Sequence, residues 1–151
     1  MGVAENLADL GLQIPEVPAP VAAYVPAVRS GAYVYTSGQL PLADGQLLAT
    51  GKVGGEVTPE TAYDCARRSA LNAIATVASQ VDDIDAVRIV KVVVFVASTP
   101  DFTGQPAVAN GASELLGAAF GDRGVHARSA VGVPVLPLDA PVEVELIAEV
   151  L

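Results

Sequence analysis

The stretch HARSAVGVPVLPLDAPVEVELIAEV, from His126 to Val150, decides how this chain folds. Val, Ala and Leu dominate both of its halves, and a proline-rich turn separates them. Branched side chains favour extended backbone, whereas proline interrupts the hydrogen bonding of a sheet. The pattern therefore predicts two strands, over His126–Val133 and Val142–Val150, joined by an irregular connection.

Charged side chains interrupt this apolar pattern in both strands. Arg128 lies near the start of the first strand, and Glu143 and Glu145 lie in the second. On an alternating strand, Arg128 shares its face with Ala130 and Gly132, whose small size leaves room for a guanidinium to reach a ligand. Two interpretations fit this pattern. Arg128 either captures a carboxylate with its planar fork or forms a salt bridge to Glu143 or Glu145 from an adjacent strand.

The rest of the chain supplies the partners for these strands. Ala32–Ser37 alternates like a half-buried strand, and Val87–Ala97 is the longest run of β-branched residues. A threonine followed by proline and glutamate predicts the start of a helix over Thr58–Gln80, and a second helix is predicted over Ala107–Phe120. We therefore expect an α+β fold, in which both helices pack on one face of a mixed sheet.

Such a fold leaves the opposite face of the sheet uncovered. We expect that face to carry Tyr33, Tyr35 and Arg128, which together are too apolar for water and too polar for a monomer core. A subunit interface would cover it, so the sequence predicts an oligomer. The 151 residues are expected to form one domain, residues 1–151, with an N-terminal extension over residues 1–20.

Composition argues against several classes of function. The net charge at pH 7 is −9, and an acidic chain repels nucleic-acid phosphates. Cys65 is the one cysteine and His126 the one histidine, which argues against a disulfide, a His-rich metal site and a Ser-His-Asp triad. We interpret Cys65 as a buried, inert thiol and His126 as structural. Neither a signal peptide nor an apolar run long enough for a bilayer is evident, so we expect a cytoplasmic protein with no membrane partner.

Three blocks of the chain resemble the RidA (YjgF-like) family: AAYVPAVRSGAYVYTSGQLP at 22–41, KVVVFVAS with the DF at 101–102, and ARSAVGVPVLPLDAPVEVELIAEV at 127–150. The third block is the most specific, because it matches the Arg-Ser start and the spacing to Leu-Pro and to the last-strand glutamate. The chain departs from the family at Gly132, in a longer loop over 43–55 and in the NGAS-containing second helix region. It is identified as a member of a divergent subgroup.

The resemblance implies a chorismate-mutase-like fold and a homotrimer with clefts between its subunits. It also implies hydrolysis of reactive enamines and imines, such as 2-aminoacrylate or 2-iminobutyrate, to 2-keto acids and ammonia, with no cofactor and no metal. In the family an arginine binds the substrate carboxylate, and Arg128 matches it. The other matching positions are Tyr24, Ser37, Gly38 through its backbone, the acidic Glu143, and Ala130, whose carbonyl would hold a water.

The chemistry suits these residues, because an iminium carbon is already electrophilic and needs mainly orientation and a placed water. Glu143 would orient or deprotonate the water, or donate a proton to the departing ammonia, and the sequence leaves these roles open. The alternative function is a non-catalytic module that binds small carboxylates in the same intersubunit cleft. A ribonuclease is disfavoured by the net charge and by the absence of a second histidine.

Overall fold

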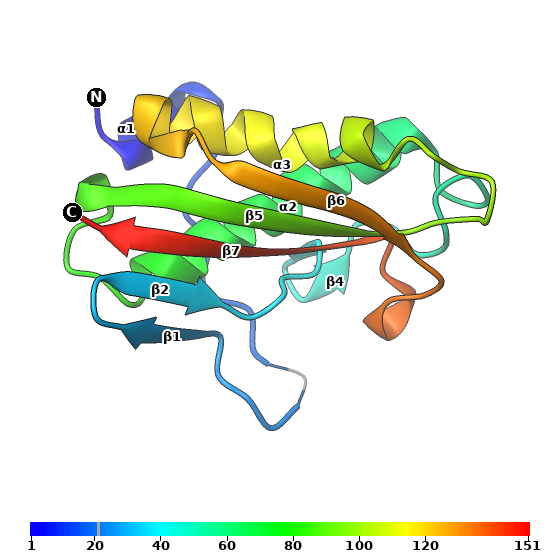
Figure 1. The fold of residues 1–151 in the computed structure, drawn as a ribbon, viewed down its shortest axis with the longest axis horizontal. Coiled ribbons are helices and arrows are strands. Elements are labelled where there is room, and N and C mark those ends of the chain that lie inside the picture. The colour runs from blue at the N-terminus through cyan, green and yellow to red at the C-terminus, as the bar shows by residue number, and fades with distance from the viewer. Residues whose placement is uncertain (21) are drawn as a thin grey trace.

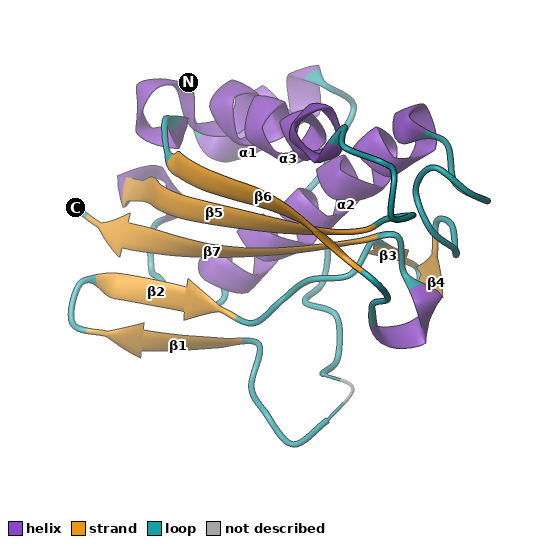
Figure 2. Ribbon diagram, turned by 45° about the vertical axis from the view of Figure 1, so that its right-hand side comes forward, coloured by secondary structure: helices purple, strands orange, loops and turns teal. Residues whose placement is uncertain are grey.

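In the computed structural model, which describes residues 1–20 and 22–151, a five-stranded sheet is covered by helices on one face (Figures 1 and 2). This is the α+β arrangement that the sequence predicts. The elements in chain order are α1 (Val3–Asp9), β1 (Ala27–Ser30), β2 (Tyr33–Thr36), β3 (Leu42–Ala43), β4 (Gln46–Leu47), α2 (Pro59–Ala78), β5 (Val87–Ala97), α3 (Gln105–Phe120), β6 (Ala127–Val133) and β7 (Val142–Val150).

The strands of the main sheet follow the order β1-β2-β7-β5-β6. Only β6 pairs in parallel with its neighbour, β5, and the other neighbours in the sheet are antiparallel. A parallel pair needs a crossover connection, and α3 provides it. The bounds predicted for β5 and β7 are those observed, whereas β1 has three exposed residues out of four and was not predicted as a strand.

Helix α2 begins where the sequence predicts. The Thr58 hydroxyl accepts a hydrogen bond from the Thr61 N–H at 3.1 Å, and Pro59 occupies the first helical position. One side of α2 is buried throughout, and it consists of Ala62, Ala66, Ala70, Ala73, Ile74 and Val77. These side chains pack against α3 and β7, so α2 and α3 form one layer on the sheet.

The two faces of the sheet differ in cover. On the covered face, which packs against α2 and α3, residues such as Val34, Val92 and Val144 are fully buried. On the other side no helix lies over the strands (Figures 1 and 2). We call this side the open face; its residues alternate with the buried ones, and they include Val28, Tyr33, Tyr35, Lys91, Val93, Phe95, Val131, Glu143, Glu145, Ile147 and Glu149.

Two smaller features complete the fold. Helix α1 packs beside α3 at the N-terminal end of the chain, where Val3 and Leu7 are fully buried and the Asn6 amide donates to the Ala119 carbonyl at 2.8 Å. Strands β3 and β4 form a hairpin within the predicted loop region. The Asn72 amide of α2 donates to the carbonyls of Leu40 and Leu42, both at 3.0 Å, and so holds this segment on the helix. In the described part of the chain, no helix is long and apolar enough to cross a membrane.

Close packing between α2 and α3 depends on Gly111. A Cβ at this position would collide with the backbone carbonyl of Tyr63 in α2. We therefore expect Gly111→Ala to lower the free energy of unfolding by about 1–3 kcal/mol through overpacking, although alanine is the better helix former. Urea unfolding followed by circular dichroism measures the change.

Gly117 provides the matched control, because it lies in the same helix and a Cβ there meets no atom within 4 Å. Gly117→Ala should stabilise the protein by up to about 1 kcal/mol. If both variants changed stability in the same direction, the proposed close contact between the helices would not matter for stability.

Candidate functional site

Arg128 lies on the covered face of the sheet, beneath α3. Its partner in the parallel register is Val92, which is fully buried against the helices, and paired residues share a face. The prediction that Arg128 shares the uncovered face with Tyr33 and Tyr35 is therefore wrong. Alternation in a sequence shows which residues share a face, but the pairing of β6 with β5 determines which face that is. Ala130 and Gly132 share the face of Arg128, as predicted.

Three groups of α3 hold the Arg128 guanidinium. Its Nη1 donates to Asn110 Oδ1 at 2.8 Å and to Ser113 Oγ at 3.2 Å, and its Nη2 donates to the Pro106 carbonyl at 3.4 Å. The three acceptors come from successive turns on one side of the helix. Sequence reasoning did not identify Asn110 or Ser113, although both lie in the NGAS segment. The pattern that could have identified them is a pair of polar residues, three positions apart, in a helix made mostly of Ala, Gly and Leu.

These contacts leave one edge of the guanidinium available. Both Nη1 hydrogens of Arg128 are used, whereas Nε has no partner among the described residues and Nη2 keeps one free hydrogen. The Nε and Nη2 donors lie side by side on the planar fork, with the spacing of the two oxygens of a carboxylate. Nε and Nη2 of Arg128 therefore each keep a donor for a carboxylate while Nη1 stays bound to α3.

A salt bridge from Arg128 to the glutamates of β7 does not form. Strand β5 lies between β6 and β7, so the two strands that carry these charges are not adjacent. Glu143 and Glu145 pair with Phe95 and Val93 on the open face, opposite to the face of Arg128. Within one chain, Arg128 and Glu143 are thus separated by the sheet.

Glu143 instead lies against Gly38. A Cβ on Gly38 would overlap the Glu143 carboxylate, so a larger residue at position 38 would displace the Glu143 side chain. The segment is fixed by Gln39, whose N–H donates to the Val144 carbonyl at 2.8 Å and whose carbonyl accepts from the Val144 N–H at 3.0 Å. Burial, and then the negative charge of Glu145, raise the pKa of the Glu143 carboxyl above its usual value.

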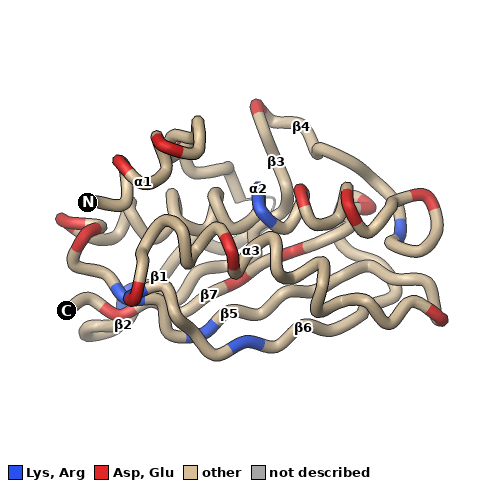
Figure 3. Tube along the Cα trace, turned by 90° about the horizontal axis from the view of Figure 1, so that it is seen from above, with Lys and Arg blue, Asp and Glu red and all other residues tan. Residues whose placement is uncertain are grey.

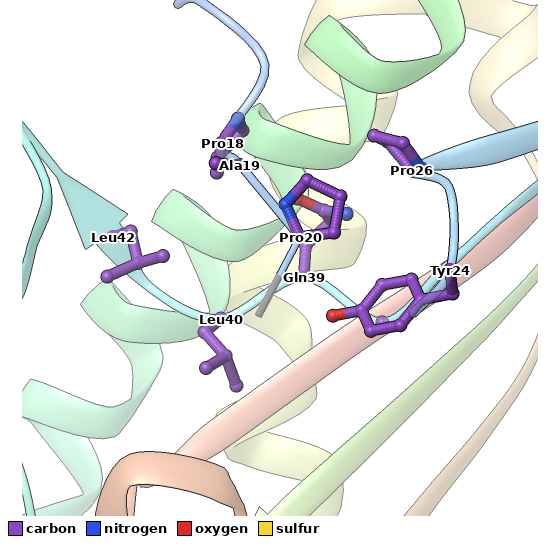
Figure 4. Close-up of a pocket in the computed structure, with 9 residues that line it drawn as sticks. Pro18, Ala19, Pro20, Tyr24, Pro26, Gln39, Leu40 and Leu42 are labelled. Carbon is purple, nitrogen blue, oxygen red and sulfur yellow. The ribbon is translucent and has the colours of Figure 1, made fainter. Parts of the chain in front are cut away.

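Ser37 links this segment to the loop that carries Tyr24. The Ser37 hydroxyl donates to the Val25 carbonyl at 2.6 Å, and the Ser37 N–H donates to the Pro26 carbonyl at 2.8 Å. Figure 4 shows the pocket beside this loop, which Tyr24, Gln39 and Leu40 line together with Pro18, Ala19, Pro20, Pro26, Gly38 and Leu42. The cavity measures about 30 Å³, which suits one or two waters rather than an amino-acid-sized ligand.

The predicted site residues therefore form two groups on the single chain. One group consists of Arg128 and Ala130 on the covered face, and the other consists of Tyr24, Ser37, Gly38 and Glu143. Residues 1–20 and 22–151 contain no cluster of His, Cys, Asp and Glu side chains that could hold a metal ion.

The predicted burial of Cys65 is confirmed. The thiol lies within α2 and is fully buried, and burial raises its pKa to about 11. A thiol with such a pKa is almost entirely protonated at neutral pH, so it is a poor nucleophile.

Residues 15–150 match the sequence pattern of the family described as Endoribonuclease L-PSP. The chain belongs to this family. Protein TCP17 of Trypanosoma cruzi is 44% identical over 149 residues, which cover 97% of this chain and 93% of that protein.

Two solved structures of the family resemble the chain along most of its length. The protein Atu1372 of Agrobacterium tumefaciens, of unknown function, is 39% identical with a TM-score of 0.92, and the match covers 98% of this chain and 92% of that one. The YjgF gene product of Escherichia coli is 27% identical with a TM-score of 0.67, and the match covers 99% and 98% of the two chains. The resemblance to the RidA (YjgF-like) family is thus confirmed.

The raised pKa of Glu143 makes stability depend on pH. The folded protein holds this proton more tightly than the unfolded chain, so its stabilising effect is complete below the unfolded value of 4.5 and is lost as the pH rises through the folded-state pKa. Glu143→Gln mimics the protonated carboxyl. We expect this variant to be more stable than the wild type at neutral pH and no more stable below pH 4.5, as measured by urea midpoints across that range.

The contribution of Glu145 can be separated by carboxyl-carbon NMR titration. Glu145→Gln should lower the pKa of Glu143, because it removes a like charge from the same face. Glu149→Gln, further along β7, should leave the Glu143 titration unchanged. An unshifted Glu143 midpoint in Glu145→Gln would contradict this account of the charge interaction.

Proposed function

We propose that this protein is a 2-iminoacid deaminase, which hydrolyses intermediates such as 2-aminoacrylate or 2-iminobutyrate to 2-keto acids and ammonia. The observation that carries the proposal is the free Nε–Nη2 edge of Arg128, held in place by α3. This edge suits the carboxylate common to all 2-imino acids. The resemblance to the RidA family supports the same assignment of Arg128.

The reaction needs little from the protein beyond orientation and one proton carrier. A 2-aminoacrylate first tautomerises to the 2-imino acid, whose C=N carbon is electrophilic. Water adds to this carbon, a proton moves to the nitrogen, and cleavage of the C–N bond releases ammonia and the 2-keto acid. Glu143 fits the proton transfers, because its raised pKa brings protonated and ionised forms closer in population near neutral pH.

The proposal requires two chains. Arg128 and Glu143 lie on opposite faces of one sheet, and the pocket beside Tyr24 is too small for the substrate. Tyr33, Tyr35 and Val131 are 40%, 46% and 43% exposed on the open face, which is the surface that a neighbouring chain would cover. A homotrimer, which the family resemblance implies, would bring the Arg128 group of one chain to the Glu143 group of the next.

Charge argues against ribonuclease activity despite the description of the family. The net charge is −9, and Figure 3 shows acidic residues outnumbering basic ones along the trace, with no run of basic positions. Nucleic-acid binding depends mainly on Lys and Arg contacts to phosphate. A carboxylate-sized anion needs only one well-placed arginine.

A coupled assay tests the activity directly. 2-Aminoacrylate is generated in situ by a dehydratase, and its conversion to keto acid should be faster with the protein present. Arg128→Ala should reduce kcat/KM by about 100-fold or more, because the loss of a charge-assisted pair costs roughly 3 kcal/mol or more. Arg128→Lys should recover only part of this loss, since it keeps the charge without the fork.

Arg29→Ala is the control, because Arg29 lies on the edge strand β1 and is exposed. This variant should behave as the wild type. If the wild type gives no acceleration but binds 2-oxobutyrate in an Arg128-dependent manner by calorimetry, the protein is the non-catalytic carboxylate-binding module instead.

Assembly is tested by sedimentation velocity. We expect the wild type to sediment at three times the mass of the 15.3 kDa chain. Val131→Asp places a charge on the open face and should shift the protein toward the monomer and abolish activity. Leu10→Asp, at the end of α1 in the helical layer, is equally exposed and should leave the assembly intact. A monomeric wild type would overturn the two-chain site.

A further inference from the structure

His126 extends the contacts of Arg128 by two hydrogen bonds. Ser113 Oγ, which accepts from Arg128 Nη1 at 3.2 Å, lies 2.9 Å from His126 Nε2. On the other side of the ring, His126 Nδ1 lies 2.6 Å from the Gly124 carbonyl oxygen. The side chains of Arg128, Ser113 and His126 thus form a continuous hydrogen-bonded series that ends on the backbone.

The backbone carbonyl determines the direction of the bond at Nδ1. A carbonyl only accepts, so Nδ1 of His126 carries a proton, and in the neutral ring with this tautomer Nε2 is an acceptor. The Ser113 hydroxyl then donates to Nε2 and turns a lone pair toward Arg128. Gly124 is itself buried and lies so close to α3 that a Cβ there would collide with the Leu116 carbonyl. This close packing holds the Gly124 carbonyl, the last acceptor of the series, in place.

The sequence brings the three side chains together through two simple periodicities. His126 lies one residue before β6 and two residues before Arg128, so in extended backbone the two side chains project to the same side. Asn110 and Ser113 are three residues apart on α3 and present neighbouring side chains to that strand. The lone histidine, interpreted from the sequence as structural, therefore contacts a residue that binds Arg128.

We propose that Ser113 and His126 are positioning residues, which hold the Arg128 guanidinium so that its Nε–Nη2 edge stays free for the substrate carboxylate. A long arginine side chain on an edge strand has about 2 kcal/mol of rotamer freedom to lose on binding. The Ser113–His126 pair removes part of this freedom before the substrate arrives, which improves binding without any contact to the substrate. This inference rests on the proposed function, since it assigns a role within the same site.

A serine beside a histidine also resembles a nucleophile with its base. The contacts favour the positioning role, because Ser113 Oγ already accepts a hydrogen bond from a cationic guanidinium. That bond draws electron density from the oxygen and lowers its nucleophilicity. It also occupies one of the two lone pairs of the hydroxyl oxygen.

The test compares Ser113→Ala and His126→Phe with two conservative variants, Ser113→Thr and His126→Gln. The first two remove the series, whereas threonine keeps the hydroxyl and glutamine can place its amide oxygen where Nε2 lies. In the coupled assay, we expect the disruptive variants to raise KM about tenfold, which corresponds to ~1.4 kcal/mol, and to change kcat by less than about twofold. The conservative variants should retain most of the wild-type KM.

Guanidinium NMR gives a second readout that is independent of activity. Rotation about the Cζ–Nη bonds of Arg128 should be slow in the wild type and faster in both variants, because Nη1 loses a partner in Ser113→Ala and that partner loses its own contact in His126→Phe. Glu114→Ala is the matched control: it removes the contact between Glu114 of α3 and the Tyr63 hydroxyl, one residue from Ser113, and should leave both readouts unchanged.

The two readouts separate failure of this inference from failure of the proposed function. If Ser113→Ala and His126→Phe keep the wild-type KM and guanidinium rotation while Arg128→Ala is inactive, the positioning role is overturned and the deaminase proposal stands. If the wild type gives no acceleration, the deaminase proposal falls, and the rotation measurement still decides whether Ser113 and His126 hold the guanidinium.

Discussion

The parallel pairing of β5 with β6 is the constraint on which the rest of this structure depends. It requires a crossover, and α3 supplies it by lying across the strands that it connects. The same pairing places Val92 opposite Arg128 and so directs the arginine toward α3 rather than toward the open face. A shift of one residue would turn Arg128 outward and expose it to solvent or to a neighbouring chain. The register of one strand pair thus determines the surroundings of the candidate binding group.

The second requirement of the site is the absence of a side chain at two positions where another group lies against the backbone. At Gly111 it lets α3 approach α2, and at Gly38 it lets the Glu143 carboxylate lie directly on the chain. In both places the space for a side chain is occupied by another part of the molecule. Glycine serves here through its small size, without any special backbone angle. The packing of α3 on α2 and the position of the Glu143 side chain therefore both depend on a residue without a side chain.

The sequence predicts those parts of the fold that local patterns determine. The β-branched run gives β5, the alternating pattern gives β7, and the Thr58 cap gives the start of α2, because each depends on neighbouring residues alone. Strand β1 was missed, since an edge strand with one buried residue has almost no hydrophobic periodicity.

The site was predictable only in part for the same physical reason. The resemblance gave positions such as Arg128 and Glu143, but the face that each occupies follows from strand order and register, which are non-local. The salt-bridge interpretation of Arg128 is wrong because β5 separates the two strands. Asn110 and Ser113 became recognisable only once α3 was seen to lie over β6.

An anionic substrate presents a problem for a chain with a net charge of −9, and the two halves of the site address it differently. Arg128 provides local attraction, which at contact distance outweighs the field of distant surface charges that salt screens. Glu143 would repel a carboxylate if it were ionised, yet burial and Glu145 favour its protonated form. The like charge of Glu145 on the same strand therefore has a use in the proposed reaction: together with burial it increases the fraction of Glu143 that carries a proton, which can later pass to the departing ammonia, and so reduces the negative charge that the substrate meets.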